Sequence, residues 1–312
     1  MRISTFKRLH TEDRLFSLYW ELRLLLYLGV LLLTTGLGIL VYKHIDTIGH
    51  QAVLAFIAAV TLASFFYCVR KIPPFNWDKT TVADPLFDYA VLLGCLSLLI
   101  FIGYIQYEYD VFGDHYGLAT FLPMVVLFCA AYYFDHLGAL SLAITNLAAW
   151  AGIAVTPLQI LRGGNFGDTR LIIIGMLLGC VLLTFGHLSS IRRLKGHFEL
   201  TYSNFGLHLF FIAALAGLFK FDGIYLIWFA VLMGIAWYLG SRAFGRRSFY
   251  FIVVIVLYAY IALSYVVLHS MLTYTVFSFE LVLMYFILSA TGMALFLVYL
   301  NRQLKRYDRL QQ

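Results

Sequence analysis

The chain has 312 residues, of which 62% are hydrophobic and only 12% are charged, and its mean hydropathy is +0.86. Soluble domains are close to half apolar and a quarter charged, so this composition excludes an ordinary soluble domain and predicts one membrane domain. The net charge of +6 fits a basic membrane surface that attracts anionic lipid headgroups. Nucleic acid is not an expected partner.

The first 22 residues are basic and polar, with apolar side chains interspersed. A cleaved signal peptide would have a short apolar core and a small-residue cleavage site. Residues 1–22 therefore predict a cytoplasmic amphipathic lead-in. A flexible tail is the alternative.

Ten apolar stretches follow, each close to the roughly 20 residues that a helix needs to cross a hydrocarbon core of about 30 Å. They cover residues 24–42, 51–69, 88–106, 118–134, 137–156, 171–190, 204–220, 223–240, 249–268 and 277–300. The fourth and seventh are the shortest. Because lipid penalises unpaired backbone groups and the runs do not alternate as barrel strands do, we expect an all-α polytopic transmembrane helix bundle over residues 23–300. Residues 301–312 are expected to form a cytoplasmic basic tail.

The basic residues predict the orientation of these spans, since Lys and Arg near span ends stay preferentially in the cytoplasm. With the amino terminus inside and ten spans, 18 of the 22 basic residues fall on the inner side. The other four are Lys43, Arg162, Arg170 and Lys220. We therefore expect a multi-pass protein of the inner membrane with both termini in the cytoplasm.

The two halves of the chain share a short motif. Gly29 to Gly36 reads GVLLLTTG and Gly179 to Gly186 reads GCVLLTFG, so both follow GxxLLTxG in the first and sixth spans. Two inverted five-helix halves, 23–156 and 171–300, are one interpretation because transporters are often built this way. The other is that both motifs are small-residue packing surfaces.

Small residues elsewhere predict close helix packing, because lipid gives helices no hydrophobic reason to associate. The predicted packing glycines are Gly29, Gly36, Gly152, Gly175, Gly179, Gly186, Gly217 and Gly292. In the fifth span, Ser141 and Thr145 lie on one helical face with Asn146 beside them, and this helix is expected inside the bundle.

Few polar groups are available for chemistry at mid-membrane. The residues selected as candidates for substrate binding are Asn146, Thr145, Ser141, Thr34, Thr184 and Glu280. Asn146 either contacts a substrate or bonds a neighbouring helix, and Glu280 either faces the apolar slab or reaches the outer interface.

Polar residues near the span ends form two further groups. On the outer side, His44, Asp46, His50, Glu108, Asp110, Asp114, His115, His269 and Glu280 either converge on a cation such as zinc or are solvated loop residues. On the inner side, Asp135, His136, His187 and His208 suggest a pH-sensitive site or helix capping.

Other chemistry is not predicted. All four cysteines, Cys68, Cys95, Cys129 and Cys180, lie in apolar segments, so we expect no disulfide. No metal-ligand spacing, cofactor loop or paired nucleophile and base is present in the sequence. We therefore predict no metal site, no cofactor and no enzymatic activity.

The segment LRLLLYLGVLLLTTGLGILVYKHIDTIGHQAVLAF, residues 22–56, resembles the start of a bacterial family of multi-pass membrane proteins of unknown function. The resemblance implies an inner-membrane protein and supplies no ligand. Ten spans in about 300 residues are also similar in architecture to the drug and metabolite transporter superfamily. The loops 70–87 and 157–170 are longer than the compact architecture of that superfamily would predict.

Two functions are compatible with these patterns. The first is secondary transport of a small solute or lipid-like molecule, at a site between the halves near Asn146. The second is a non-catalytic membrane scaffold, or a subunit of a homo- or hetero-oligomeric complex.

Overall fold

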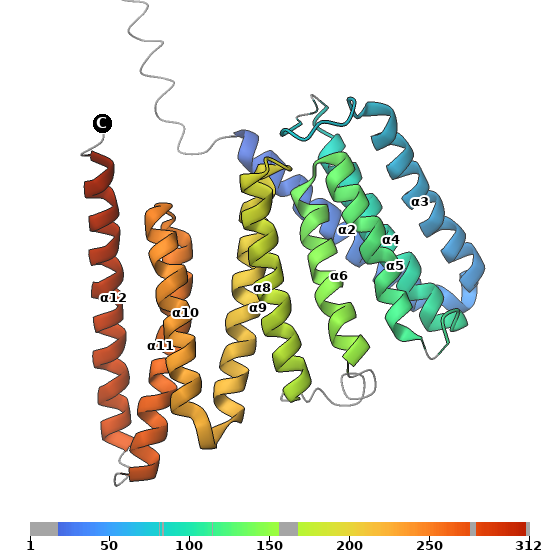
Figure 1. Cartoon of the computed structure of the whole chain (residues 1–312). Helices are drawn as coiled ribbons and strands as arrows, with labels where there is room; N and C mark the ends of the chain where they lie inside the picture. Colours follow the sequence, from blue (N-terminus) through green and yellow to red (C-terminus); the bar gives the residue numbers. More distant parts are fainter. Residues whose placement is uncertain are drawn as a thin grey trace, which may run out of the picture. The chain divides into compact units, whose positions relative to one another are not determined.

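The computed structural model describes residues 18–80, 82, 84–113, 115–155, 168–274 and 279–309. Over these residues the chain is all-α, as predicted, with ten α-helices, two short 3-10 helices and no strand (Figure 1). The α-helices are α2 (Leu18–Ile48), α3 (His50–Lys71), α4 (Phe87–Tyr109), α5 (Tyr116–Phe134), α6 (Leu137–Val155), α8 (Thr169–Ile191), α9 (Glu199–Lys220), α10 (Tyr225–Gly245), α11 (Phe249–Tyr274) and α12 (Phe279–Arg309). The 3-10 helices are η1 (Gly196–Phe198) and η2 (Asp222–Ile224).

Each predicted span corresponds to one of the ten helices, and the differences lie at their ends. α2 begins at Leu18 and α12 continues to Arg309, so parts of the predicted lead-in and tail are helical. Arg, Lys, Gln and Leu are good helix formers, and no breaker separates residues 301–309 from the last span. Residues 1–17 and 310–312 lie outside the described residues.

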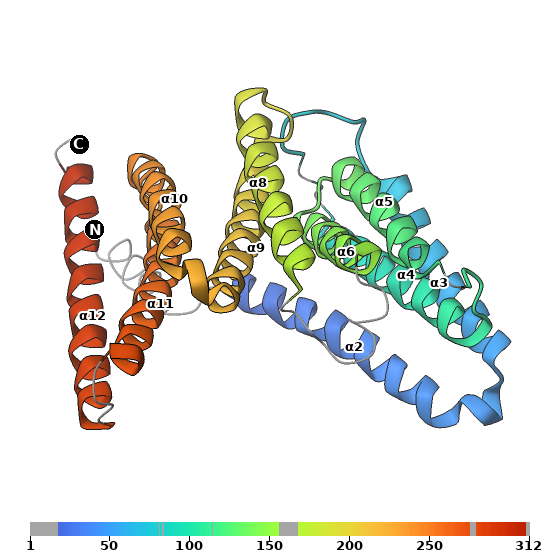
Figure 2. The same ribbon diagram turned by 60° about the horizontal axis from the view of Figure 1, so that its bottom comes forward.

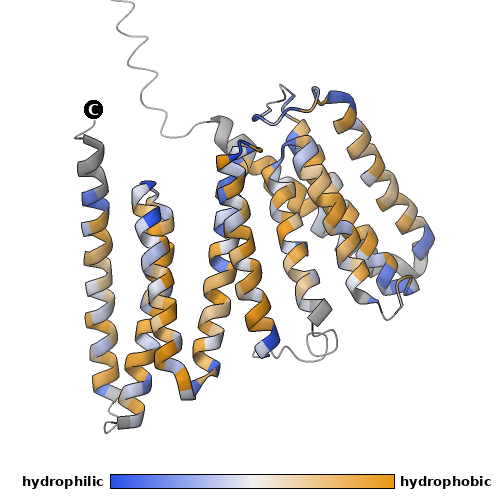
Figure 3. Ribbon diagram, in the orientation of Figure 1, coloured by the Kyte–Doolittle hydropathy of each residue, from blue (hydrophilic) through white to orange (hydrophobic). Residues whose placement is uncertain are grey.

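Eight of the described helices are long and apolar enough to cross a membrane. The two with shorter apolar stretches are α2, over Leu24–Ile39, and α6, over Leu137–Gly152, rather than the predicted fourth and seventh. Polar residues gather at helix ends and apolar ones along the helix bodies (Figure 3). Large side chains such as Leu62 and Trp237 are exposed, as expected for helices that have lipid as their solvent.

Local signals explain several helix ends. Gly49 separates α2 from α3 with a φ of 84°, in the left-handed region that glycine enters without a steric penalty. Two prolines, Pro73 and Pro74, follow α3, where they prevent the helix from continuing. Asp110 and Asp135 end α4 and α5 in the left-handed conformation, which Asp tolerates better than most residues.

The chain divides into two compact units. Unit 1 comprises Met1–Trp150 with Ser189–Phe198, and unit 2 comprises Ala151–Leu188 with Glu199–Gln312. In unit 1, α4 packs against α2, α3 and α5, and α2 runs obliquely past the others (Figure 2). Buried Val91, Cys95 and Leu127 contribute to its core.

Unit 2 is built on α9, α10 and α11, which pack against one another, with α12 against α11. Its buried cluster includes Phe211, Leu218, Leu232 and Ala262, and the Phe211 ring stacks on Tyr258 with centroids 5.1 Å apart. The predicted halves 23–156 and 171–300 remain a prediction, as does their inverted relation.

Three of the predicted packing glycines, all on α8, face α9 closely. A methyl group added at Gly179 would lie 2.7 Å from Phe210 Cβ, and one at Gly175 would lie 3.0 Å from Ala213 Cβ. A methyl at Gly186 would be 3.0 Å from Ser203 Oγ. α8 and α9 therefore meet along a face of small residues, the arrangement that membrane helices use to approach closely.

The remaining predicted glycines differ among themselves. Gly217 of α9 lies against the Trp228 ring, whose Nε1 donates to the Ala214 carbonyl at 2.7 Å. Methyl groups added at Gly29, Gly36 or Gly292 would meet nothing within 4 Å among the described residues.

Candidate functional site

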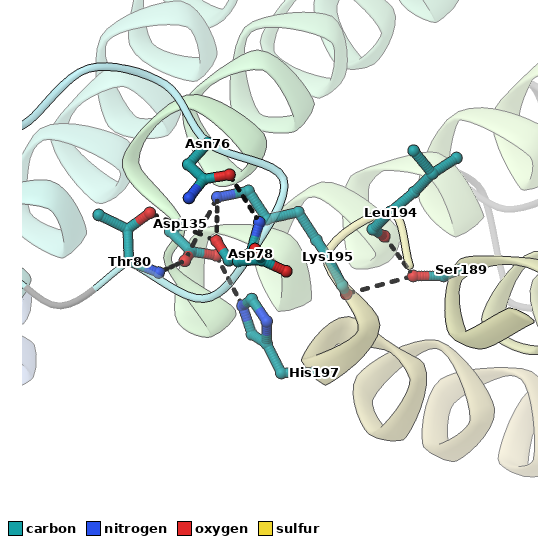
Figure 4. A network of polar contacts seen from close by, with 8 residues as sticks. All are labelled: Asn76, Asp78, Thr80, Asp135, Ser189, Leu194, Lys195 and His197. Carbon is teal, nitrogen blue, oxygen red and sulfur yellow. Dashed lines mark hydrogen bonds and ion pairs between the residues drawn. The ribbon is translucent and has the colours of Figure 1, made fainter. Parts of the chain in front are cut away.

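Three chain segments that are far apart in the sequence meet at one end of unit 1. They are the connection after α3, the turn between α5 and α6, and the segment from Ser189 to Phe198, which contains the last residues of α8 and the loop after it. Alternation of ten spans requires these segments to lie on the same side. Their polar groups form one network (Figure 4).

Asp135 is the centre of this network, and its side chain is only 2% exposed. Its Oδ2 accepts a hydrogen bond from the Thr80 backbone N–H at 2.5 Å and lies 3.3 Å from Lys195 Nζ. Its Oδ1 is 2.6 Å from His197 Nε2. One buried carboxylate therefore joins all three segments, as Figure 4 shows.

Lys195 is as deeply buried as its partner, with 1% of its side chain exposed. Besides Asp135, its ammonium group approaches the Asp78 carbonyl at 3.5 Å and lies 5.3 Å from the centre of the Phe75 ring. Its backbone N–H donates to the Trp77 carbonyl at 3.1 Å. A buried charge needs such partners because desolvation is costly, and Lys195 has both a counter-ion and neutral acceptors.

The segment that carries Lys195 is itself shaped by local bonds. The Ser189 hydroxyl reaches the Leu194 carbonyl at 2.6 Å and the Lys195 carbonyl at 3.2 Å. Arg193 and Lys195 both have positive φ, 54° and 53°. The short loop therefore turns tightly, so that Lys195 points toward Asp135.

The turn between α5 and α6 places two titratable side chains side by side. Asp135 ends α5 with a φ of 57°, and the His136 Nδ1 accepts the Ala139 backbone N–H at 3.1 Å. A methyl added at Gly138 would lie 2.8 Å from His136 Cε1, so glycine leaves room for the ring. The predicted capping role of His136 matches this geometry.

Next to the network lies a cavity of about 800 Å³ within unit 1. Its polar lining residues come from α2, α4, α6 and the three connecting segments, and they are Tyr27, Lys79, Thr80, Asp88, Asp135, His136, Ser141, Thr145 and His197. The cavity also has apolar walls that include Leu31, Leu92 and Phe134. It can hold a small molecule and offer it donors, acceptors and apolar surface together.

Ser141 and Thr145, both predicted to bind substrate, line this cavity. Their hydroxyls donate to helix carbonyls one turn back, at 3.0 and 2.9 Å, which leaves the oxygens able to accept. Asn146 contacts the Leu142 carbonyl of its own helix at 3.4 Å. The buried face of α6 consists of Ala139, Leu140, Ala143 and Ile144, so the polar face is turned toward the cavity and not into the packed interior.

The other predicted substrate residues are not among the residues that line it. Thr34, in unit 1, and Thr184, in unit 2, each donate to a carbonyl of their own helix, at 2.9 and 2.7 Å. Glu280 is exposed in the first turn of α12. A substrate site between the two halves remains a prediction.

A second, mainly apolar cavity of about 390 Å³ in unit 1 is lined by Thr34, Ser97 and, from the outer group, His50 and Glu108. His50 Nδ1 lies 2.7 Å from the Tyr104 hydroxyl and 3.3 Å from Glu108 Oε1. Among the described residues, no group of three His, Cys, Asp or Glu side chains could hold a metal ion. Asp114 and the side chains of His44 and Asp46 lie outside the described residues.

The inner histidines of unit 2 have separate partners. His208 Nδ1 lies 2.8 Å from the Tyr258 hydroxyl. His187 faces two guanidinium groups, those of Arg242 and Arg246. Neither histidine belongs to the Asp135 network.

Sequence reasoning identified Asp135 and His136 but missed Lys195 and His197. Lys195 was counted among the basic residues that set the orientation, with no partner assigned to it. A signal existed, since Lys195 and His197 lie in a short connection predicted on the same side of the membrane as Asp135. Pairing them required the register of segments 60 residues apart, which the hydropathy pattern does not give.

No curated protein and no solved structure matches the chain. Residues 2–140 match the model of a family described as "Predicted membrane protein (DUF2157)", which confirms the resemblance seen in residues 22–56 and extends it as far as the beginning of α6. Over these residues, which include Thr80, Asp135 and His136, the chain is similar to that family of membrane proteins of unknown function.

Proposed function

We propose that this membrane protein is a secondary transporter of a small polar solute, which it binds in the cavity of about 800 Å³ in unit 1. The observation that carries the proposal is this cavity, because it combines a predicted substrate face, Ser141 and Thr145, with the buried Asp135 network. Its volume falls within the range of about 300 to 1,000 Å³ that is usual for small-molecule sites.

The lining favours a solute of low net charge with several hydrogen-bonding groups. Asp135 is already balanced by Lys195, and the remaining charged residues of the lining, Asp88 and Lys79, have opposite signs. Hydroxyl and imidazole groups supply donors and acceptors for a polar molecule. The cavity beside Thr34 has a less polar lining and would suit a lipid-like molecule better.

The Asp135 network also offers a means of closing one end of the cavity. It ties the connection after α3 and the segment around Lys195 to the end of α5, and Asp135, Thr80 and His197 line the cavity themselves. Because Asp135 carries a bond to each segment, a change at this one carboxylate would weaken both attachments together. Such a two-state contact is what alternating access requires.

We place the protein in a bacterial inner membrane with both termini in the cytoplasm, so that the network lies at the cytoplasmic end. The support is the distribution of basic residues, 18 of 22 on the predicted inner side.

The test is uptake into proteoliposomes of radiolabelled amino acids, polyols and carboxylic acids, driven by a preset proton or sodium gradient. At least one class should enter faster than in protein-free liposomes, and Thr145→Val should slow its uptake about three- to tenfold if one hydrogen bond is lost. Thr291→Val is the matched control, because Thr291 is exposed on α12 and its hydroxyl donates to the Ile287 carbonyl of the same helix.

A second measurement tests whether water reaches the cavity. Cysteine at position 141 or 145, in a variant without the four native cysteines, should react with a membrane-impermeant maleimide from one side. No uptake of any class, together with unreactive cysteines at both positions, would contradict the proposal.

A scaffold function is the second candidate, favoured by unit 2. A mainly apolar cleft of about 740 Å³ among α10, α11 and α12 includes the small residues Gly240, Ser289 and Gly292. Such a surface suits another membrane helix. Crosslinking from position 292 in membranes should then trap a homo- or hetero-oligomer, and a protein that remains monomeric would argue against this candidate.

A further inference from the structure

We infer that unit 2 carries a separate site for the phosphate group of an anionic phospholipid, formed by Arg242, Arg246 and His187 between α8 and α10. The inference does not depend on transport. It rests on the geometry, the charge and the shape of a small cavity.

The two arginines converge on one imidazole ring. Arg242 and Arg246 lie one helical turn apart at the end of α10, and their Nη2 atoms are 3.1 and 3.3 Å from His187 Nδ1. A guanidinium group can only donate hydrogen bonds. The ring nitrogen that they approach can only accept, and a histidine side chain has no negative charge to offset the two positive ones.

One carboxylate accompanies these two cations. Glu199 forms an ion pair with Arg246, and no other acid among the described residues pairs with either guanidinium. The cluster therefore carries an excess of one positive charge. A phosphodiester has one negative charge, and its oxygens match the forked donors of arginine.

The adjoining cavity has the size of a phosphate group and an apolar side. Its volume is about 80 Å³, compared with about 30 Å³ for one water molecule in the liquid, so it has room for a phosphate group, and the rest of a larger ligand would lie outside it. The lining residues are Leu183, His187, Glu199, Ser203, Leu207, Leu239, Arg242, Ala243, Arg246, Phe251 and Ile255.

The surroundings favour a phospholipid over a soluble phosphate. Trp237 and Tyr238 precede the arginines on α10 and are 81% and 57% exposed, and such aromatic residues are typical of the membrane interface. The Tyr238 hydroxyl also approaches Arg242 Nη1 at 3.4 Å. Basic pockets between membrane helices commonly hold anionic headgroups.

The test uses the full chain, purified in mild detergent and titrated with phosphatidylglycerol or phosphatidylcholine while native mass spectrometry records bound lipid. Phosphatidylglycerol should bind more tightly, and Arg242→Gln should weaken its binding about tenfold or more, as expected for a lost charge-assisted contact. Arg70→Gln is the matched control, because Arg70 lies over the Phe66 ring in unit 1 and loses the same charge. Glu199→Gln should strengthen binding, since it removes the one acid.

Three results would overturn the inference. They are equal binding of the two lipids, an equal loss in Arg70→Gln, and displacement of phosphatidylglycerol by inorganic phosphate alone, which would indicate a soluble ligand. Arg242→Lys keeps the charge without the fork and should bind with intermediate affinity. It also tests the site if Arg242→Gln fails to elute as a folded protein.

Discussion

At the scale of single residues, the contact between Asp135 and Lys195 has a direct consequence for stability. Both side chains are almost completely buried, so removing one partner leaves a charge without its counter-ion. Breaking a buried pair in this way typically costs about 3 to 5 kcal/mol. Removing one partner alone is therefore expected to cost more stability than removing one partner of an exposed ion pair.

We predict that Lys195→Met lowers the thermal stability of the detergent-solubilised protein strongly, and that Asp135→Asn combined with Lys195→Met restores much of the loss. The reason is that the double variant has no unpaired buried charge. Circular dichroism melts would measure both. Asp78→Asn is the control, because only the Asp78 carbonyl contacts Lys195, and a double variant that is as unstable as the sum of the single variants would contradict the prediction.

Asp84, in the connection after α3, allows a prediction about pH. Its carboxylate accepts a hydrogen bond from the Tyr67 hydroxyl at 2.6 Å and another from the Leu86 backbone N–H at 3.1 Å, and it pairs with Lys71 at 3.3 Å. The Tyr67 bond is the largest of the causes that lower the pKa of Asp84 below its ordinary value. These contacts favour the ionised form.

A lowered pKa in the folded state means that Asp84 stabilises the fold above its unfolded pKa of about 3.9. This contribution is lost as the pH falls through the lower folded value. Asp84→Asn should therefore melt below the wild type at pH 7, and the two melting curves should converge as the pH falls below 4. A difference that stays constant down to pH 3 would exclude the ionised carboxylate as the source.

At the scale of elements, the two GxxLLTxG motifs differ in their packing even though they share a sequence. Gly179 on α8 lies against α9, where an added methyl would be 2.7 Å from both Phe210 Cβ and its backbone N, while Gly29 on α2 has open space within 4 Å. The shared motif therefore does not by itself indicate a shared packing role.

We predict opposite effects of the same substitution at these two positions. Gly179→Ala should destabilise the protein by about 1 to 3 kcal/mol because it overpacks the contact between α8 and α9. Gly29→Ala should be neutral or stabilise by about 0.5 to 1 kcal/mol because alanine favours the helix. Denaturation in detergent micelles measures both, and equal losses would mean that α2 has a packing partner at Gly29.

The helices themselves were predictable because hydrocarbon length and continuous apolar sequence are local properties. The observed helix ends differ from the predicted ones where no helix-breaking residue is present. An example is α12, which was predicted to end at residue 300 and continues to Arg309. Ser141 and Thr145 share one face of α6, as their spacing predicts, and both line the cavity. Their role in substrate binding stays a prediction. Their hydroxyls bond carbonyls of their own helix, so this face does not need a buried partner.

At the scale of the whole molecule, the site depended on contacts that the sequence does not encode locally. Asp135 and Lys195 are brought together by tight turns with positive φ at Asp135, Arg193 and Lys195. None of these residues is a glycine, so the sequence does not predict the left-handed backbone conformation at these turns. The predicted number of spans places the loops that carry Asp135 and Lys195 on the same side of the membrane. The contact between the two side chains, however, follows from how α5 and α8 end.

The orientation of the whole chain gives the last prediction, since ten spans place every second connection on the same side. Cysteine at position 78, after α3, and at position 247, after α10, should share one side, while position 107 near the end of α4 should lie on the other. All three native residues are exposed. In intact bacterial cells expressing a variant without native cysteines, a membrane-impermeant maleimide should label position 107 alone, and the other two should react only after permeabilisation. If one helix between residues 78 and 247 did not span the membrane, positions 78 and 247 would be labelled from opposite sides, so the experiment tests the number of spans and the cytoplasmic placement of the Asp135 network together.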